Sequence, residues 1–114
     1  MSISGAATED AAAGAVFAAL ADPTRRRIVR ALADGDTVTA SSLAAGLPVT
    51  RQAVAKHLAA LRAAGLAVAE PAGRETRYRL TPAPFTDAVR WMASTGARWD
   101  DRLARLDRRL ETGA

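Results

Sequence analysis

The chain has 114 residues, of which 49% are hydrophobic, and a formal net charge of +4. This length supplies one compact core and excludes two domains, and no apolar run approaches the roughly 20 residues that a membrane span needs. The sequence contains no cysteine, which excludes disulfides and thiolate metal sites and fits a reducing compartment, so we expect a cytoplasmic protein that does not enter membranes.

The positive charge is concentrated in one segment. Residues 51–80 carry six basic and two acidic side chains, a net charge of +4, while the charges of the remaining residues sum to zero. A focused basic patch is expected of a surface that binds phosphates, although a solvated basic face is the simpler alternative. The charge therefore points to nucleic acid only if a binding motif lies in the same segment.

The N-terminal part predicts a tail followed by a helix. Residues 1–10 contain Ser, Gly and Thr and are expected to be disordered. Residues 11–20 form a short alanine-rich pattern with Val16 and Leu20 on one side, which predicts the first helix of a single domain that extends to the end of the chain.

A second helix is predicted from residue 23 to about Ala33. Asp22 is a good N-cap, Pro23 suits the first helical position because its missing N–H would be unpaired there, and Gly35 ends the helix.

Two further helices with a tight turn between them follow. Thr39 or Ser41 is expected to cap a short third helix, residues 46–48 form the turn, and Thr50 caps a fourth helix over residues 51–64. Two short helices joined in this way form a helix-turn-helix unit.

The hydrophobic period then changes from helical to alternating. Residues 66–70 and 76–80 each alternate apolar and polar side chains, and turn-forming residues separate them at 71–75. A hairpin alone is only marginally stable, so it must pack against the helices. A basic hairpin directly after a helix-turn-helix unit is the winged variant of that motif.

The fourth helix has one apolar face and one face of small side chains. Val54, Leu58 and Leu61 recur at helical spacing and are expected to be buried. Gln52 and Lys56 project from the opposite face, among alanines. Such a flat surface suits the major groove, where Gln pairs with adenine and Lys with guanine.

This pattern predicts five DNA contacts from the fourth helix. Arg51, Gln52 and Lys56 are the candidates for base contacts, because the N-terminal residues of a recognition helix reach the base edges. Thr50 and Arg62 lie nearer the helix ends and are expected to contact phosphates, although Arg62 is equally explained as a solvated side chain.

The hairpin carries further candidate contacts. Arg74 lies at the predicted tip and Arg77 on one strand face, where they would contact the DNA backbone or the adjacent minor groove. Arg79 shares the face of Arg77, but an ion pair with Glu70 or Glu75 explains it equally well.

His57 is the only histidine and flanks the buried face of the fourth helix. We expect it to contact the DNA backbone or to make a supporting hydrogen bond, because one imidazole without a second His or Cys cannot form a transition-metal site. No GxSxG, HExxH or P-loop motif is present, so the sequence predicts neither an enzyme nor a bound cofactor or metal.

The last predicted helix, residues 84–111, carries an apolar seam. Its spacings alternate between 4 and 3, which is the coiled-coil pattern, at Phe85, Val89, Met92, Gly96, Trp99, Leu103, Leu106 and Leu110. Gly96 either lets two helices approach closely or marks a bend. A seam this apolar needs a partner, so we predict a homodimer through this helix and the first helix, with Val16 and Leu20 contributing.

Three motifs resemble the ArsR/SmtB family of bacterial winged helix-turn-helix repressors. They are FAALADPTRRRI at residues 17–28, PVTRQAVAKHLAALRAAGL at 48–66, and GRETRYRL at 73–80. The resemblance implies that Thr50, Arg51, Gln52, Lys56 and the wing arginines contact operator DNA, and that the first and last helices form the dimer.

Metal-sensing members of that family carry Cys pairs in the third helix or His, Asp and Glu ligands in the last. Here the third helix is SSLAA and the last helix has no histidine. The chain is therefore similar to the cysteine-free branch, whose inducers are mostly undefined.

The sequence thus predicts a mainly α fold of about five helices with a two-stranded wing, and a homodimeric repressor of an inverted-repeat operator. One alternative is a winged helix used only for protein contacts. Another is a sensor of an unknown small-molecule inducer, without a metal, that uses a pocket near Trp91 and Trp99; packing against the first helix is the simpler explanation of Trp91.

Overall fold

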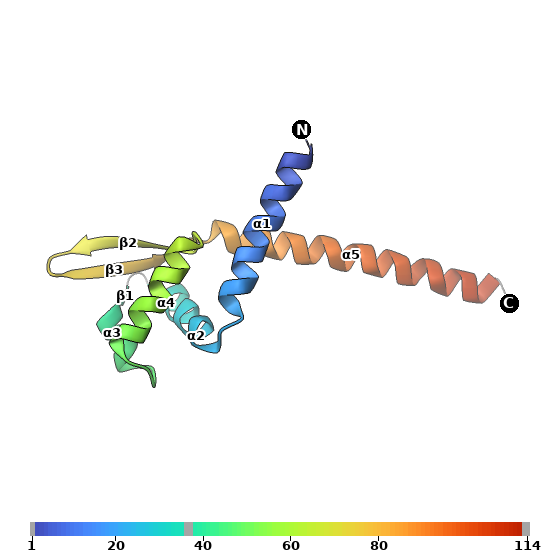
Figure 1. The fold of residues 1–114 in the computed structure, drawn as a ribbon. Helices are drawn as coiled ribbons and strands as arrows, with labels where there is room; N and C mark the ends of the chain where they lie inside the picture. Colours follow the sequence, from blue (N-terminus) through green and yellow to red (C-terminus); the bar gives the residue numbers. More distant parts are fainter. Residues whose placement is uncertain (1, 36–37, 113–114) are drawn as a thin grey trace.

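The computed structural model describes residues 2–35 and 38–112, and this part of the chain forms five helices and three strands (Figure 1). The predicted winged helix-turn-helix fold is confirmed. In chain order the elements are α1 Ser2–Leu20, α2 Pro23–Asp34, β1 Val38–Thr39, α3 Ala40–Ala45, α4 Arg51–Ala63, β2 Ala67–Ala72, β3 Glu75–Leu80 and α5 Ala83–Thr112.

The first helix is longer than the sequence predicted. It begins at Ser2 instead of Ala11, so the segment expected to be a disordered tail is helical from residue 2 onward. This segment contains no proline and a single glycine, and alanine continues through it, so no strong helix breaker separates it from the rest of α1.

The core lies where α1, α2, α3 and α4 meet the base of the wing. Its largest fully buried side chains are Val16, Ile28, Val54, Leu58, Leu61 and Leu66. The prediction that Val16 contributes to a dimer interface is wrong, because this side chain is only 2% exposed and packs within its own chain. Leu20 and Phe85 also pack partly against this core.

The wing is a three-stranded antiparallel sheet with the order β1-β3-β2. The third strand, β1, was not predicted; it pairs Val38 with Tyr78 and Thr39 with Arg77. The hairpin between β2 and β3 turns at residues 73 and 74, with Gly73 at a φ of 64°. Glycine takes this left-handed conformation without steric cost, which permits the tight turn.

Strand β2 continues beyond the predicted boundary, through Pro71 to Ala72. Proline lacks the N–H that a central strand must donate, but β2 is an edge strand of this sheet. The missing N–H of Pro71 therefore removes no hydrogen bond to a strand on the outer side of β2.

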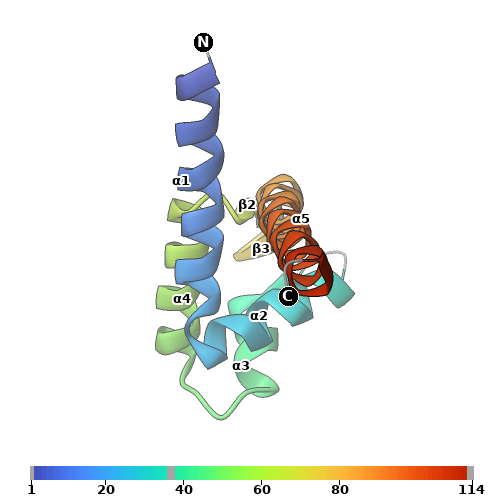
Figure 2. The same cartoon turned by 90° about the vertical axis from the view of Figure 1, so that its right-hand side faces the viewer.

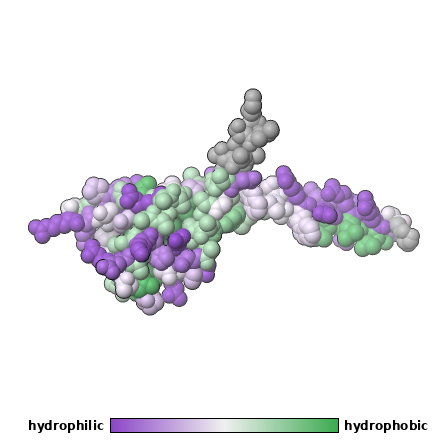
Figure 3. All heavy atoms as spheres, in the orientation of Figure 1, coloured by the Kyte–Doolittle hydropathy of each residue, from purple (hydrophilic) through white to green (hydrophobic). Residues whose placement is uncertain are grey.

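Helix α5 crosses α1 and then leaves the rest of the fold (Figures 1 and 2). At the crossing the rings of Phe17 and Trp91 meet edge to face, with their centroids 5.6 Å apart. From Val89 to Thr112 every residue of α5 is exposed, and its apolar side chains lie along one side of the projecting part (Figure 3). No helix among the described residues has the length and apolar character to cross a bilayer.

Candidate nucleic-acid interface

Helix α4 is held in place by its cap and its apolar face. Thr50 Oγ1 accepts a hydrogen bond from the Ala53 amide at 3.1 Å, as expected of an N-cap. Val54, Leu58 and Leu61 are completely buried, which confirms the predicted inner face. The opposite face is consequently directed to solvent.

The predicted DNA-contacting side chains of α4 lie on this outer surface. Arg51, Gln52, Lys56 and Arg62 are all exposed, and so are the intervening Ala55 and Ala59. Only short side chains stand between Gln52 and Lys56, so a flat surface such as a base-pair edge can approach both.

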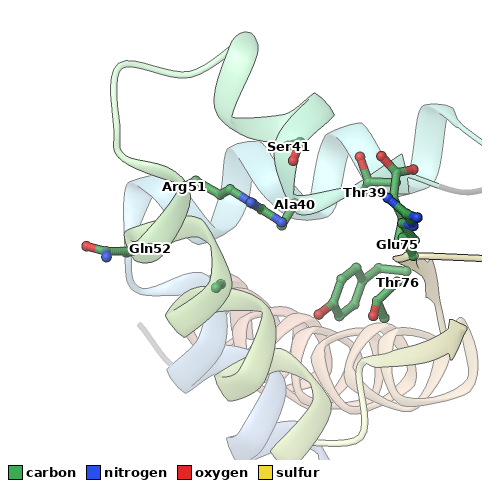
Figure 4. Close-up of a pocket in the computed structure, with 10 residues that line it drawn as sticks. Thr39, Ala40, Ser41, Arg51, Gln52, Glu75 and Thr76 are labelled. Carbon is green, nitrogen blue, oxygen red and sulfur yellow. The ribbon is translucent and has the colours of Figure 1, made fainter.

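An open groove of about 340 Å³ runs between the start of α4, the β1–α3 corner and the wing (Figure 4). Arg51 points into this groove toward Ala40 and Ser41, whereas Gln52 extends away on the other side of the helix (Figure 4). The residues that line the groove are Thr39, Ala40, Ser41, Arg51, Gln52, Ala55, Arg74, Glu75, Thr76 and Tyr78.

The groove brings together only part of the predicted site. Arg51, Gln52 and Arg74 share it, while Arg62 lines a separate shallow hollow between α4 and β2. The structure also adds hydroxyl groups that sequence reasoning missed, on Thr39, Ser41 and Thr76. From the sequence, Thr39 and Ser41 were expected only as alternative caps of the third helix. Thr39 is the N-cap of α3, with its Oγ1 accepting a hydrogen bond from the Ser42 amide at 3.1 Å.

The wing presents different residues on its two faces. Tyr78 is half-buried and lines the groove, whereas Arg77 and Arg79 are exposed and belong to the alternate face of β3. Arg79 Nη2 lies 2.8 Å from Glu70 Oε1, which is the ion pair that the sequence offered as an alternative to a DNA contact.

His57 has a structural partner. It is half-buried, and its Nδ1 accepts a hydrogen bond from Arg25 Nε at 3.2 Å. Of the two interpretations open to the sequence, the structure therefore supplies the supporting hydrogen bond. This ring nitrogen joins α2 to α4, and the contact of His57 with the DNA backbone remains the alternative prediction.

Asp22 completes this junction at the start of α2. Its Oδ1 accepts a hydrogen bond from the Arg25 amide at 2.9 Å. This backbone hydrogen bond, aided by the nearby guanidinium of Arg25, holds the pKa of Asp22 below its usual value.

Comparison with known proteins places this architecture in a family. Residues 20–69 match a family model described as a helix-turn-helix domain. The structure of an ArsR-like transcriptional regulator from Rhodococcus sp. RHA1 is similar with a TM-score of 0.76 and 45% identity, covering 91% of this chain and 94% of that chain. The chain belongs to the ArsR family of transcriptional regulators. The expected resemblance is thus confirmed, and this is a family of regulators, not of enzymes.

Two curated relatives of this ArsR-family chain are also regulators. The transcriptional repressor SdpR of Bacillus subtilis (strain 168) is 31% identical over 88 residues, which cover 77% of this chain and 97% of SdpR. The HTH-type transcriptional regulator CmtR of Mycobacterium tuberculosis is 48% identical over 71 residues, 62% of this chain. That match spans only 59% of the length of CmtR.

One of these relatives, CmtR, is described as a metal sensor. Its NMR structure, with a TM-score of 0.51 to this chain, is described as that of a cadmium metal-sensor. The present sequence has no cysteine, and within residues 2–35 and 38–112 no three His, Asp or Glu side chains are grouped to hold a metal ion.

Proposed function

We propose that this ArsR-family chain is a sequence-specific DNA-binding repressor that acts as a homodimer on an inverted-repeat operator. The observation that carries the proposal is the groove that Arg51 of α4 and Arg74 of the wing tip both line, beside the outward-directed Gln52 (Figure 4). Seven of the ten residues that line this groove belong to segment 51–80, which holds the net positive charge of the chain. A cationic groove beside an exposed helix of small side chains suits a DNA duplex.

Base recognition is assigned to Gln52 and Lys56. Gln52 extends outward at the N-terminal turn of α4 (Figure 4), and Lys56, one helical turn later, is also exposed. In the major groove, Gln is suited to adenine N6 and N7, and Lys to guanine O6 and N7.

Contacts with the phosphate backbone of DNA are assigned to residues that line the protein groove. Arg51 points into it, so we move Arg51 from the base-reading group to the phosphate-binding group (Figure 4). Arg74 and the hydroxyl-bearing Ser41 and Thr76 share the same lining and suit phosphate oxygens. Thr50, Arg62 and Arg77 remain candidates for contacts outside the groove.

Dimerisation and repression have separate support. The seam of α5 is exposed from Val89 to Leu110, and an apolar surface of this extent favours association. A two-fold dimer would present two copies of α4 about one DNA turn apart, roughly 34–36 Å, and would therefore select an inverted repeat. The similarity to the repressor SdpR supports repression as the outcome.

Salt dependence of binding to duplex DNA tests the proposal. If phosphates are neutralised, log affinity falls linearly with log salt, with a slope of about −0.9 for each phosphate contacted. Arg74→Ala should weaken binding to all sequences alike and reduce the slope by about 1. Arg108→Ala, which removes an exposed charge from the projecting part of α5, is the matched control and should leave the slope unchanged.

If the affinity for DNA depends on neither the salt concentration nor the DNA sequence, the alternative of a winged helix that contacts only proteins is favoured instead. Gln52→Ala provides the second arm, because it should relax the preference at one base position without changing the slope. An unaltered preference profile in Gln52→Ala would overturn the assignment of α4 as the reading helix.

A hollow at the α1–α5 crossing supports a second function, response to a small molecule. It measures about 420 Å³ and is lined by Asp10, Asp87, Arg90, Trp91, Ser94, Thr95 and Arg98. Trp99 lies outside it, on the open face of α5, so the two tryptophans do not share one pocket. Quenching of Trp91 fluorescence in a Trp99→Phe variant by metabolite fractions would detect a ligand, and Trp91→Phe is the control.

A further inference from the structure

The hollow at the crossing of α1 and α5 is lined by charges of both signs around an aromatic ring. Its volume is about 420 Å³, and its charged and aromatic lining consists of Asp10 on α1 and of Asp87, Arg90, Trp91 and Arg98 on α5. Ligand pockets of proteins usually measure about 300 to 1,000 Å³, so one small molecule fits here. The chemistry of these side chains indicates which kind of molecule that is.

We propose that the hollow binds a free amino acid with an aromatic side chain. Its ammonium group would bind Asp87, its carboxylate Arg90, and its ring would lie against Trp91. Ser94, one helical turn beyond Arg90, also lines the hollow and would donate its hydroxyl to the same carboxylate. This inference rests on the second proposed function, response to a small molecule, and names the class of ligand.

The charged side chains of the hollow do not neutralise one another. Within residues 10–35 and 38–112, whose side chains the structure describes, the only ion pair joins Arg79 to Glu70. The formal charges of the two aspartates and two arginines in the hollow cancel, so an anion or a cation alone would leave charges of the other sign without a partner. A zwitterion supplies one group of each sign.

The positions of Asp87 and Arg90 suit the head group of an α-amino acid. They are three residues apart on α5, so their side chains are neighbours on one surface of the helix. The ammonium and carboxylate groups of an α-amino acid are attached to the same carbon atom, so they reach two such neighbours together. Asp87 is half-buried, and its carboxylate is therefore less screened by water than a fully exposed one.

Trp91 supplies the surface for an aromatic side chain. Phe17 meets its ring edge to face and fixes it from the side of α1, yet Trp91 remains 41% exposed. A second aromatic ring would cover part of this exposed indole and form a further aromatic pair, which an aliphatic side chain cannot do.

The hollow lies away from the apolar stripe of α5, the exposed seam that runs from Val89 through Leu103 to Leu110. At about 100° per residue, Ser94 and Arg98 lie roughly opposite Leu103 around the helix. A homodimer that covers the stripe therefore does not by itself fill the hollow.

Isothermal titration calorimetry of the unchanged chain with L-phenylalanine tests the inference. 3-Phenylpropionate lacks the ammonium group and 2-phenylethylamine lacks the carboxylate, so each should bind at least about tenfold more weakly. L-Alanine, which lacks the ring, should also bind more weakly than L-phenylalanine. The NMR signal of the Trp91 indole N–H, identified with the Trp99→Phe variant, should shift when L-phenylalanine is added.

Two variants assign the two charged contacts. Asp87→Asn should weaken binding of L-phenylalanine about tenfold but should not weaken 3-phenylpropionate, which has no ammonium group. Arg90→Gln should weaken L-phenylalanine but not 2-phenylethylamine. Asp101→Asn removes an exposed acid of α5 that does not line the hollow, so this matched control should bind L-phenylalanine as the unchanged chain does. Circular dichroism checks that all three variants remain folded.

Three results would each overturn the inference: no binding of L-phenylalanine up to its solubility limit, equal binding of the three phenyl compounds, or a Trp91 signal that does not move. If metabolite fractions quench Trp91 fluorescence while L-phenylalanine does not bind, only the ligand class is wrong. Binding of L-phenylalanine to a chain that binds no DNA would contradict only the proposed repressor, because DNA affinity is measured separately on the ligand-free chain.

Discussion

Single side chains at the start of α2 and at the start and middle of α4 hold α4 in place. Thr50 caps α4, and the Arg25–His57 hydrogen bond joins α4 to α2. The N-terminal turn of α4 carries both Arg51 and Gln52, so its orientation determines where these two side chains point.

Thr50→Ala should lower the free energy of unfolding by about 1 kcal/mol, because the Ala53 amide loses its acceptor. Urea denaturation measures this change, and Thr50→Ser, which keeps the hydroxyl, is the control. Equal stability of the Ala and Ser variants would show that the cap does not hold the helix.

His57→Ala should also lower the free energy of unfolding, by about 1 kcal/mol, since it removes the acceptor for Arg25. The salt slope of DNA binding should stay as in the unchanged chain, because the structure gives His57 a partner inside the protein. A salt slope reduced by about 1 would instead show that His57 contacts a DNA phosphate.

Asp22 should make stability depend on acid pH. Its pKa is lowered in the folded chain, so its carboxylate contributes stability above the usual aspartate pKa of about 4, and this contribution is lost as the pH falls through the lowered value. Asp22→Asn keeps a capping oxygen but does not titrate. The stability difference between the two proteins should therefore shrink below pH 4; a constant difference from pH 7 to pH 2 would contradict this account.

Among the elements, those with a local signal were predictable from sequence. The period of Val54, Leu58 and Leu61 located α4 and its inner face, and alternation along residues 76–80 located β3 and its two faces. Strand β1 has only two residues, too few to show a period, and it exists because Val38 pairs with Tyr78 far along the chain. Val16 was misassigned because the sequence pattern of an apolar helix face is the same whether that face packs on the core of its own chain or on a second subunit.

Helix α5 offers a test of the proposed homodimer. Leu103→Asp should weaken association, because a charge in the apolar stripe would have to lose its water when the stripe is covered. Sedimentation equilibrium measures the dissociation constant, and Ala104→Asp, at the next exposed position of the same helix, controls for the added charge. Equal dissociation constants in the two variants would contradict a dimer formed through the stripe.

At the scale of the whole molecule, the groove could not be predicted because it combines three distant segments. Thr39, Arg51 and Thr76 come together only when β1 pairs with β3 and α4 packs against α3. The sequence identified the charged members by type and spacing, but it showed neither the hydroxyl groups as a set nor the divergence of Arg51 from Gln52 (Figure 4).

Selection of bound sites from random duplex DNA by the purified chain tests the central claim most directly. The account predicts enrichment of an inverted repeat whose half-site centres lie about 10 base pairs apart, one helical turn. In Gln52→Ala a single base position in each half-site should lose its preference. Enrichment of no sequence, or of a single unrepeated site, would contradict a dimeric protein that reads DNA with two copies of α4.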